Sequence, residues 1–367
     1  MNPADPRARR YVLMLGTSPT EKGGIAAVVG TLSEAGFFET AQVRYVATHV
    51  ETSRIAKVTQ FALAVAQTFA ALCSGRVALV HAHVSSGASF WRKAVLLGMA
   101  RACGVPTIFH LHSGAFDAFA GQGGRLRAWA VRRTLQSSDV VVVLSERWGN
   151  WVQIFAPGSV IRVIPNPVNV PTVVRPAHAP PQRRALYLGL ISEAKGTFDL
   201  LRAWAQFRRD VPGWRLAIGG NGAVDLLMSE SKRLGVDVDV DFLGWITGSD
   251  KARELNAADI FVLPSYREGM PVSILEAMAF GAAVVATPVG GVPDMMRDEV
   301  HGLLVRPGDI AGLSGALVRL ATSDELRHRL AGSARVHVRE HYATDMVVRM
   351  LCDLYGAVAE RRMRPSP

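Results

Sequence analysis

Short apolar runs alternate with helix-length segments along the first half of the chain. The runs fall at 11–15, 77–80, 107–110 and 140–144, and the longer segments include 55–73 and 90–103. Apolar runs this short, bounded mostly by Gly, Pro or Ser, are typical of strands that are buried on both faces. Strands that alternate with helices indicate crossover units and a parallel sheet. The first half therefore predicts an α/β domain.

A second series of the same kind follows a proline-rich stretch. Its expected strands are 185–188, 215–218, 260–263 and 283–286, and its expected helices are 197–207, 223–234, 272–280 and 310–321. The stretch before it, from 165 to 185, holds six prolines, which is typical of a linker or hinge. We therefore expect two parallel-sheet domains, 1–168 and 169–344, with segment 345–367 returning to complete the first. Such pairs usually bind a ligand in the cleft between them, which we expect near the linker, at the carboxyl ends of the strands.

Composition narrows the class of protein. Hydrophobic residues make up 49% of the 367 residues and charged residues 20%, which excludes global disorder and a coiled-coil rod. The longest candidate for a membrane span, 61–73, is interrupted by polar residues, and the first ten residues do not resemble a secretion signal. Three scattered cysteines make neither a disulfide framework nor a zinc-ligand spacing. We expect a reduced, cytoplasmic, soluble protein.

The net charge of +10 is concentrated in the first half. Residues 1–168 carry 17 Lys and Arg against eight Asp and Glu, which leaves +9, whereas the rest of the chain carries +1. Nucleic acid is not an expected partner, because no recognition motif and no basic run interleaved with aromatics is present. The remaining interpretations are an arginine-rich solvated surface, or attraction to an anionic inner membrane face that displays a lipid-linked diphosphate.

The sharpest candidate for chemistry is the segment 267–276, which follows an expected strand. Glu268 and Glu276 lie eight residues apart, Gly269 permits close approach of the backbone to a ligand, and Pro271 suits the start of a helix. The free amides at a helix start bind anions. Carboxylates beside an anion site suit a ligand that carries both phosphates and hydroxyls, such as a sugar nucleotide.

This segment resembles the E-x7-E motif of retaining glycosyltransferases of family 4. The likeness continues through 189–201, 220–222, 242–245, 257–265, 286–293 and 302–305, and is thinner in the first half. The resemblance implies the GT-B architecture, in which two Rossmann-like domains face each other across a cleft. It also implies transfer of a hexose from a nucleoside diphosphate sugar, with retention of the anomeric configuration and without an essential metal or other cofactor. The expected setting is bacterial exopolysaccharide or lipopolysaccharide assembly, with a lipid-diphosphate-linked or polysaccharide acceptor.

The family's roles can be carried over to matching positions. The resemblance implies that Lys195 neutralises the donor diphosphate and that His112 positions and polarises the transferred sugar; together with Glu268 these are the expected catalytic residues. Of Glu268 and Glu276, one carboxylate is expected to accept from sugar hydroxyls and the other from the ribose. Gly23 and Gly24 correspond to paired glycines whose amides meet the diphosphate from the first domain. The other positions that it assigns to donor binding are Gly220, Asn221, Trp245, Ile246, Arg267, Gly269, Met270, Pro271 and Glu276.

One departure from the family pattern concerns the phosphate site. The family usually has an arginine directly after the glycine that ends the first strand of the second domain, and this chain has Leu190 there. Part of the diphosphate charge is then left to other donors, for which Arg267 and the amides near Gly24 are the candidates. The substitution also keeps open a non-catalytic sugar-nucleotide sensor.

A second enzyme class is suggested by histidines. His81 and His83 form one H-x-H pair and His110 and His112 another, each at the end of an expected strand. Alternate residues of a strand share a face, so each pair could ligate a metal, with Asp117 as the only nearby carboxylate. The alternative function is therefore a metal-dependent hydrolase. For the membrane interpretation, the candidate contacts in the first domain are Arg92, Lys93, Arg101, Arg125, Arg127, Arg132 and Arg133.

Overall fold

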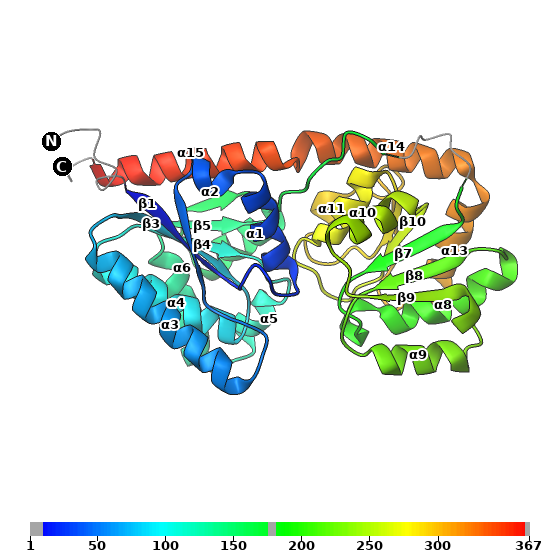
Figure 1. The fold of residues 1–367 in the computed structure, drawn as a ribbon, viewed down its shortest axis with the longest axis horizontal. Helices are drawn as coiled ribbons and strands as arrows, with labels where there is room; N and C mark the ends of the chain where they lie inside the picture. The colour runs from blue at the N-terminus through cyan, green and yellow to red at the C-terminus, as the bar shows by residue number, and fades with distance from the viewer. Residues whose placement is uncertain (1–9, 175–180, 364–367) are drawn as a thin grey trace. The chain divides into compact units, whose positions relative to one another are not determined.

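The computed structural model describes residues 10–174 and 181–363 of the chain. It divides into two compact units, which are described separately (Figure 1). Unit 1 comprises residues 1–167 and 344–367, and unit 2 comprises residues 168–343. Three stretches discussed above lie outside the described residues, namely the first nine residues, 175–180 of the expected linker and the last four residues of the expected terminal helix.

Unit 1 is built on a six-stranded parallel sheet with the order β2-β1-β3-β4-β5-β6. Helices follow the strands as crossovers, and α15 from the end of the chain also packs on this unit, against β3 and α1. The elements of the unit are β1 (Tyr11–Gly16), α1 (Gly24–Glu34), α2 (Phe37–Thr40), β2 (Val43–Ala47), α3 (Arg54–Cys73), β3 (Val77–Val84), α4 (Ala88–Ala102), β4 (Thr107–Leu111), α5 (Phe116–Gly121), α6 (Gly124–Gln136), β5 (Val140–Val143), α7 (Glu146–Phe155), β6 (Ile161–Val163) and α15 (Thr344–Met363).

Unit 2 has a second, separate six-stranded parallel sheet, with the order β12-β11-β10-β7-β8-β9. A single turn of 3-10 helix, Glu193–Lys195, precedes its first α-helix. The elements of the unit are β7 (Arg184–Leu188), α8 (Thr197–Asp210), β8 (Arg215–Gly219), α9 (Val224–Arg233), β9 (Val240–Gly244), α10 (Gly248–Ala257), β10 (Ile260–Leu263), α11 (Val272–Phe280), β11 (Ala283–Ala286), α12 (Val292–Met295), β12 (Leu303–Leu304), α13 (Ile310–Thr322) and α14 (Asp324–His341).

The two sheets confirm the expected architecture, two Rossmann-like parallel domains of the GT-B type. The central strands were predictable because they are apolar on both faces: β4, β5, β10 and β11 are buried along their whole length. Edge strands were missed. β2 and β6 alternate in exposure and β12 has two residues, so none of them carries a long apolar run.

Each sheet has one place where the direction of winding reverses. In unit 1, β1 lies between β2 and β3, and in unit 2 β7 lies between β10 and β8. Loops that leave neighbouring strands at such a point diverge and leave room for a ligand at the carboxyl ends. In unit 1 these are the loops after β1 and β3, and in unit 2 they are the loops after β7 and β10. Of the candidate residues, Gly23, Lys195 and Glu268 lie on these loops.

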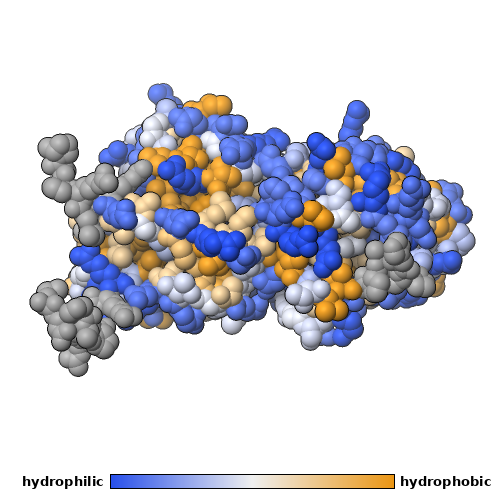
Figure 2. All heavy atoms as spheres, turned by 90° about the horizontal axis from the view of Figure 1, so that it is seen from above, coloured by the Kyte–Doolittle hydropathy of each residue, from blue (hydrophilic) through white to orange (hydrophobic). Residues whose placement is uncertain are grey.

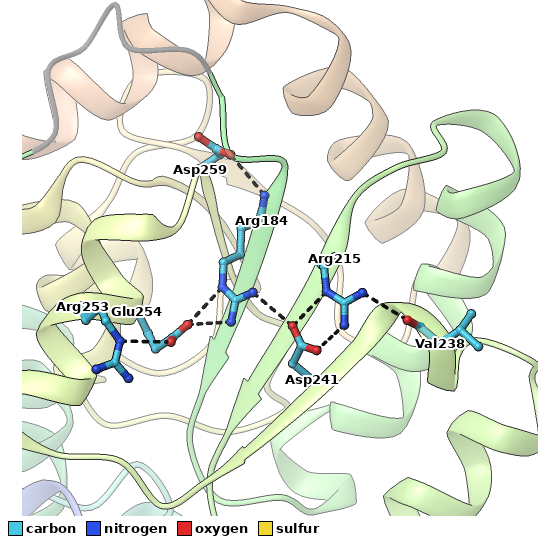
Figure 3. A network of polar contacts seen from close by, with 7 residues as sticks. All are labelled: Arg184, Arg215, Val238, Asp241, Arg253, Glu254 and Asp259. Carbon is cyan, nitrogen blue, oxygen red and sulfur yellow. Dashed lines mark hydrogen bonds and ion pairs between the residues drawn. The ribbon is translucent and has the colours of Figure 1, made fainter.

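A charged network connects the strands of the unit 2 sheet at their amino ends, opposite the candidate site (Figure 3). Arg184, at the start of β7, donates to Asp241 Oδ2 at 3.1 Å and to Glu254 Oε2 at 3.0 and 2.7 Å. Its backbone N–H donates to Asp259 at 3.1 Å. Arg215 also binds Asp241, and hydrogen bonds from Arg215 and then from Arg184 lower the pKa of that carboxyl. Because this network ties β7, β8 and β9 together at their amino ends, it stabilises the sheet away from the candidate site.

Helix α3 matches the helix-length segment expected at 55–73 but differs from the expectation about membrane-spanning length. The segment 61–73 is short as an apolar run, but the helix has 20 residues, Arg54–Cys73, and is long and apolar enough to cross a membrane by length and composition alone. Only 17% of its apolar window is buried within the unit. Ala64, Thr68 and Leu72 form its buried stripe, so one face packs and the rest is exposed.

Candidate functional site

The winding reversal in unit 2 brings the two central candidates together. Lys195 follows β7 and Glu268 follows β10, and these strands are neighbours although the residues are 73 positions apart. Lys195 Nζ donates to both carboxylate oxygens of Glu268, at 2.7 and 2.8 Å. The hydroxyl of Ser265 donates to Glu268 Oε1 at 2.6 Å. Glu268 is 6% exposed and Lys195 29%, so the carboxylate is enclosed while the ammonium reaches the surface.

Two glycines allow the loops to approach this closely. Gly290, in the loop after β11, has φ +56°, and a Cβ there would lie 1.7 Å from the carbonyl oxygen of Glu268. Gly196 has φ +67°, and a Cβ there would lie 2.1 Å from the carbonyl oxygen of Pro264. Any side chain would push back the backbone that carries Glu268 or Ser265. The positions of the Glu268 and Lys195 loops therefore depend on these glycines.

The second carboxylate of the motif also has a lysine partner. Glu276 lies on α11, and Lys251 on α10 donates to its Oε1. Glu276 is 17% exposed, so it is partly open to a ligand. Pro271 is the N-cap residue of α11, one position before the first turn in which we expected it. Met270 and Pro271 are buried, whereas Arg267 is exposed and could reach a ligand phosphate.

The other donor-binding candidates of unit 2 lie at the same sheet edge. Gly220 follows β8 and donates its backbone N–H to the carbonyl of Gly244, the last residue of β9, at 2.7 Å. The carbonyl of Asn221 accepts from the N–H of Ile191 at 2.7 Å, which links the loops after β7 and β8. Trp245, 37% exposed, and Ile246 follow β9. The structure therefore brings together the carboxyl ends of β7, β8, β9 and β10.

Leu190 occupies an exposed position at this edge. Its side chain is 47% exposed, and its carbonyl accepts a hydrogen bond from the Tyr187 hydroxyl at 2.8 Å. Burial, with a smaller contribution from Glu268, raises the pKa of Tyr187, so this hydroxyl stays a neutral donor. The loop is thus held through its backbone, and Leu190 itself contributes no charge to the site.

In unit 1 the histidine pairs lie side by side on adjacent strands. His83 pairs in register with His110, and His83 Nδ1 lies 2.8 Å from His112 Nε2. His81 bridges His110 Nδ1 at 3.0 Å and the hydroxyl of Tyr355 on α15 at 2.6 Å. Burial lowers the pKa of His112 to about 3, although a hydrogen bond with Asn166 opposes the shift. His112 is therefore neutral at physiological pH, as a residue that positions a sugar without moving its proton would be.

The cluster also bears on the metal alternative. Ligand atoms of His81, His83 and His110 lie within 4.8 Å of one another, and all three side chains are buried. Asp117, the carboxylate that a hydrolase site would need, is exposed on α5 and accepts from the N–H of Ala118. Among the described residues, this group of three therefore has no acidic ligand and no exposed position for a substrate.

Gly23 and Gly24 lie at the start of α1, after β1. Gly23 is the N-cap residue with φ 146°, both glycines are exposed, and a Cβ at either would meet nothing within 4 Å. At Gly23 the backbone conformation itself favours glycine. At Gly24 neither close packing nor a positive φ requires glycine, so an open backbone for a ligand is a sufficient reason there. The loop ends at the winding reversal of unit 1, as expected for the paired glycines.

One expected surface residue is not at the surface. Lys93 on α4 is fully buried, and burial lowers its pKa to about 7; its ammonium donates to the Ser89 hydroxyl at 3.2 Å. The expectation that Lys93 contacts a membrane is therefore wrong. The reason is that it lies on the inner face of the helix, next to half-buried Arg92 and two positions from exposed Trp91. Sequence reasoning also missed Ser265 and Lys251, since serine and lysine on loops and helix faces carry no pattern of their own.

The two six-stranded sheets and the site at the winding reversal define a GT-B glycosyltransferase fold. The structure superposes on sucrose-phosphate synthase from Thermosynechococcus elongatus with a TM-score of 0.77, at 21% identity, over 95% of this chain and 99% of the other. It also superposes on Anabaena HepE in complex with UDP with a TM-score of 0.74, at 17% identity, over 95% and 100% of the two chains. Likeness at these identities establishes the fold.

Sequence comparison gives the family. Residues 9–167 match the model "Glycosyl transferase 4-like domain", and residues 174–337 match "Glycosyl transferases group 1". The chain belongs to the group 1, family 4-like glycosyltransferases. It is 28% identical to glycogen synthase from Mycobacterium tuberculosis over 263 residues, which are 70% of this chain and 62% of that protein. The chain thus matches about three fifths of the length of this curated relative.

Proposed function

We propose that this protein is a retaining glycosyltransferase that transfers a hexose from a nucleoside diphosphate sugar. The observation that carries the proposal is the Lys195–Glu268–Ser265 constellation at the winding reversal of unit 2. HepE, which shares the fold, was solved with UDP and with UDP-glucose, which supports a uridine nucleotide as the first donor to test. The acceptor we propose is lipid-diphosphate-linked or polysaccharide, in bacterial exopolysaccharide or lipopolysaccharide biosynthesis.

The proposed mechanism places the positive charge for the diphosphate on the chain itself. An ammonium has three N–H donors, and Lys195 directs two contacts at Glu268, so one remains for a phosphate oxygen. The amides at the start of α11 and of α1 add donors aimed at an anion. No essential metal is needed in this proposal, because these groups supply the counter-charge that stabilises the departing diphosphate.

The proposed roles of the other side chains follow from where they lie. Glu268 orients Lys195 and accepts from sugar hydroxyls, and Glu276 accepts from the ribose. Trp245 and Ile246 hold the nucleobase. Neutral His112 orients the sugar, and the departing phosphate takes the acceptor's proton on the face from which it leaves, which retains the configuration. The first-unit loops hold the acceptor.

We also propose that the protein works at the cytoplasmic face of the inner membrane. The support is the net charge of +9 on residues 1–168, which a donor diphosphate held mainly by unit 2 does not require. Arg125, Arg132 and Arg133 of α6 are exposed, and Arg127 of the same helix is half-buried. Each basic residue near an anionic surface contributes about 1 kcal/mol, so several produce salt-sensitive recruitment.

A donor screen by thermal shift tests the proposal without knowledge of the acceptor. At 100 times its dissociation constant a ligand stabilises the folded state by about 2.7 kcal/mol, so UDP-hexoses and GDP-hexoses can be ranked. We expect the preferred donor to stabilise the protein in the presence of EDTA as well. We also expect the sugar in the product to have the same anomeric configuration as in the donor. Stabilisation without turnover for any acceptor would favour the sugar-nucleotide sensor. Loss of activity with EDTA, together with a stoichiometric metal in the purified protein, would favour the hydrolase or overturn the metal-free mechanism.

A further inference from the structure

The outward face of α3 is largely apolar, although Thr59 and Gln67 of the same helix are also exposed. Ile55 is 78% exposed, Val58 69%, Leu63 50% and Phe69 59%, and they lie opposite the buried stripe of Ala64, Thr68 and Leu72. No charged residue occurs between Lys57 and Arg76. A helix on the surface of a soluble domain normally has polar residues on its outer side, whereas a helix that is apolar all round is normally covered. The outer side of α3 is covered by nothing in this chain's described residues.

The neighbouring helix continues this surface. Helix α4 contacts α3 (Figure 1) and exposes Trp91, 45% accessible, and Val95, 51% accessible. We call the set of Ile55, Val58, Leu63, Phe69, Trp91 and Val95 the α3–α4 face. Figure 2 views the molecule from above and shows apolar residues, in orange, among hydrophilic ones, in blue. The α3–α4 face itself is defined by the exposed fractions of its six residues. An exposed apolar area of this kind marks an interaction site more often than a solvated surface.

Positive charges predominate near the α3–α4 face. Between Thr52 and Ser138 the chain has ten Lys and Arg, of which Lys93 is buried, and a single carboxylate, Asp117 on α5. Arg54 and Lys57 lie at the start of α3, and Arg92 lies beside Trp91 on α4. The nearest acidic residue before α3, Glu51, is engaged by Lys57 and by His49 at 3.0 Å. The partner of this face must therefore be apolar and negatively charged.

An anionic bilayer meets both requirements. Its headgroups are negative and its acyl region begins a few ångströms below them, so a helix lying in the interface buries its apolar side while basic residues stay at headgroup level. Tryptophan is favoured at the same depth. A second copy of this chain is apolar at this face but not negatively charged, so a symmetric contact through the same face would bring the cations of the two copies together.

We infer that the α3–α4 face inserts into the headgroup region of an anionic membrane, with α3 parallel to the surface. This deepens the proposed membrane location and rests on it, but it does not depend on the reaction. Insertion differs from recruitment by arginines alone in its response to salt. Screening weakens charge attraction, since the Debye length falls from about 10 Å at 0.1 M to about 3 Å at 1 M salt, whereas burial of apolar side chains persists.

The test is flotation of the full chain with phosphatidylcholine vesicles, with and without phosphatidylglycerol, at low and high salt. The variant is Val58→Gln/Leu63→Gln/Phe69→Gln, which changes no charge. The matched control is Leu226→Gln/Met228→Gln, two exposed apolar residues of α9 in unit 2. We expect the wild type and the control to bind anionic vesicles and to retain binding at high salt, and the α3 variant to bind at least tenfold more weakly at high salt.

Two readouts make the outcome decisive. The first readout is the thermal shift produced by a UDP-hexose, and an equal shift for the wild type and the α3 variant shows that the variant is folded and has an intact donor site. Loss of vesicle binding can then be distinguished from loss of the proposed glycosyltransferase function. Equal flotation of wild type and variant at all salt concentrations would overturn insertion and leave recruitment by charge. A wild type that elutes as a dimer, with a monomeric variant and no vesicle binding by either, would assign the face to a second copy.

Discussion

At the scale of single residues, Lys195 illustrates how a binding group is held ready. A free lysine on a loop samples many rotamers, and ordering it costs entropy each time a ligand binds. Here Glu268, anchored by Ser265, holds the ammonium at 2.7 and 2.8 Å. The arrangement exchanges some of the lysine's hydrogen-bonding capacity for a fixed position at the edge of the site.

This arrangement predicts that activity and stability can be separated. Lys195→Met leaves the enclosed carboxylate of Glu268 without its cation, so we expect a loss of about 1–3 kcal/mol in unfolding free energy. Turnover should fall about 10²–10³-fold, because a donor to the developing charge is removed. The double variant Lys195→Met/Glu268→Gln should recover most of the stability and none of the activity.

Denaturant unfolding and initial rates of hexose transfer measure the two effects. Lys232→Met, an exposed lysine of α9, is the control and should change neither. Recovery of activity in the double variant would show that Lys195 only neutralises Glu268 and has no role toward the donor.

At the scale of elements, the unit 2 sheet uses its two edges differently. The carboxyl edge carries glycines, loops and the candidate site, while the amino edge is tied by Arg184, Arg215 and Asp241 (Figure 3). Parallel strands buried on both faces have few ways of fixing their register other than packing. Asp241 of β9 accepts hydrogen bonds from Arg184 of β7 and Arg215 of β8, and so adds directional contacts at the amino ends of the strands, where no ligand needs room.

Asp241→Asn tests this role. The lowered pKa of Asp241 means that its ionised form is favoured in the folded state, so its stabilisation is present above the ordinary aspartate pKa of about 3.9 and is lost as the pH falls through the lowered value. We expect Asp241→Asn to lower the unfolding free energy by about 1–2 kcal/mol at neutral pH, which allows for the exposure of its partner Arg215.

Urea unfolding at a series of pH values measures the difference, which should shrink toward pH 3. Donor binding should be unchanged, because the network is at the far edge of the sheet. A difference that stays constant over the whole pH range would assign the effect of the substitution to packing.

At the scale of the whole molecule, the two units share a fold but differ in how many histidines they bury. Unit 1 encloses four histidines with depressed pKa values, His81, His83, His110 and His112. Unit 2 has two partly buried ones, His301 and His337, and burial lowers the pKa of His337 to about 4. The response of the units to acid should therefore differ.

Unit 1 is expected to lose stability first on acidification. An unfolded histidine has a pKa of about 6.5, so between that value and the depressed folded one the unfolded state binds more protons. Each such histidine then removes up to about 1.4 kcal/mol of stability per pH unit as the pH falls. Hydrogen exchange, corrected for its intrinsic pH dependence, should show β3 and β4 losing protection between pH 7 and 5 before β10 and β11.

A single substitution serves as the control for this effect. His110→Asn should reduce the pH dependence of unit 1 by about one proton, whatever it does to stability at neutral pH. Equal loss of protection in both units, or an unchanged slope in this variant, would contradict a histidine origin.

Much of this protein was determined by local sequence. The buried central strands, the helices that begin at Thr197 and Ile310, and the edge at which the candidate residues gather followed from apolar runs and from the order of the motifs. These features depend on neighbours within a few residues, so periodicity and spacing carry them. The resemblance added the roles of Lys195, Glu268 and His112, which stay predictions until the variants are measured.

Other features were decided only by the tertiary structure. The Lys195–Glu268 contact spans 73 residues and requires β7 and β10 to be neighbours, while His81 meets Tyr355 across 274 residues because α15 packs beside β3. Burial of Lys93 and exposure of the apolar side of α3 depend on how each helix is rotated against the sheet. A helix that is apolar on all sides has no pattern that selects its inner face, so only packing against its neighbours decides which side remains outside.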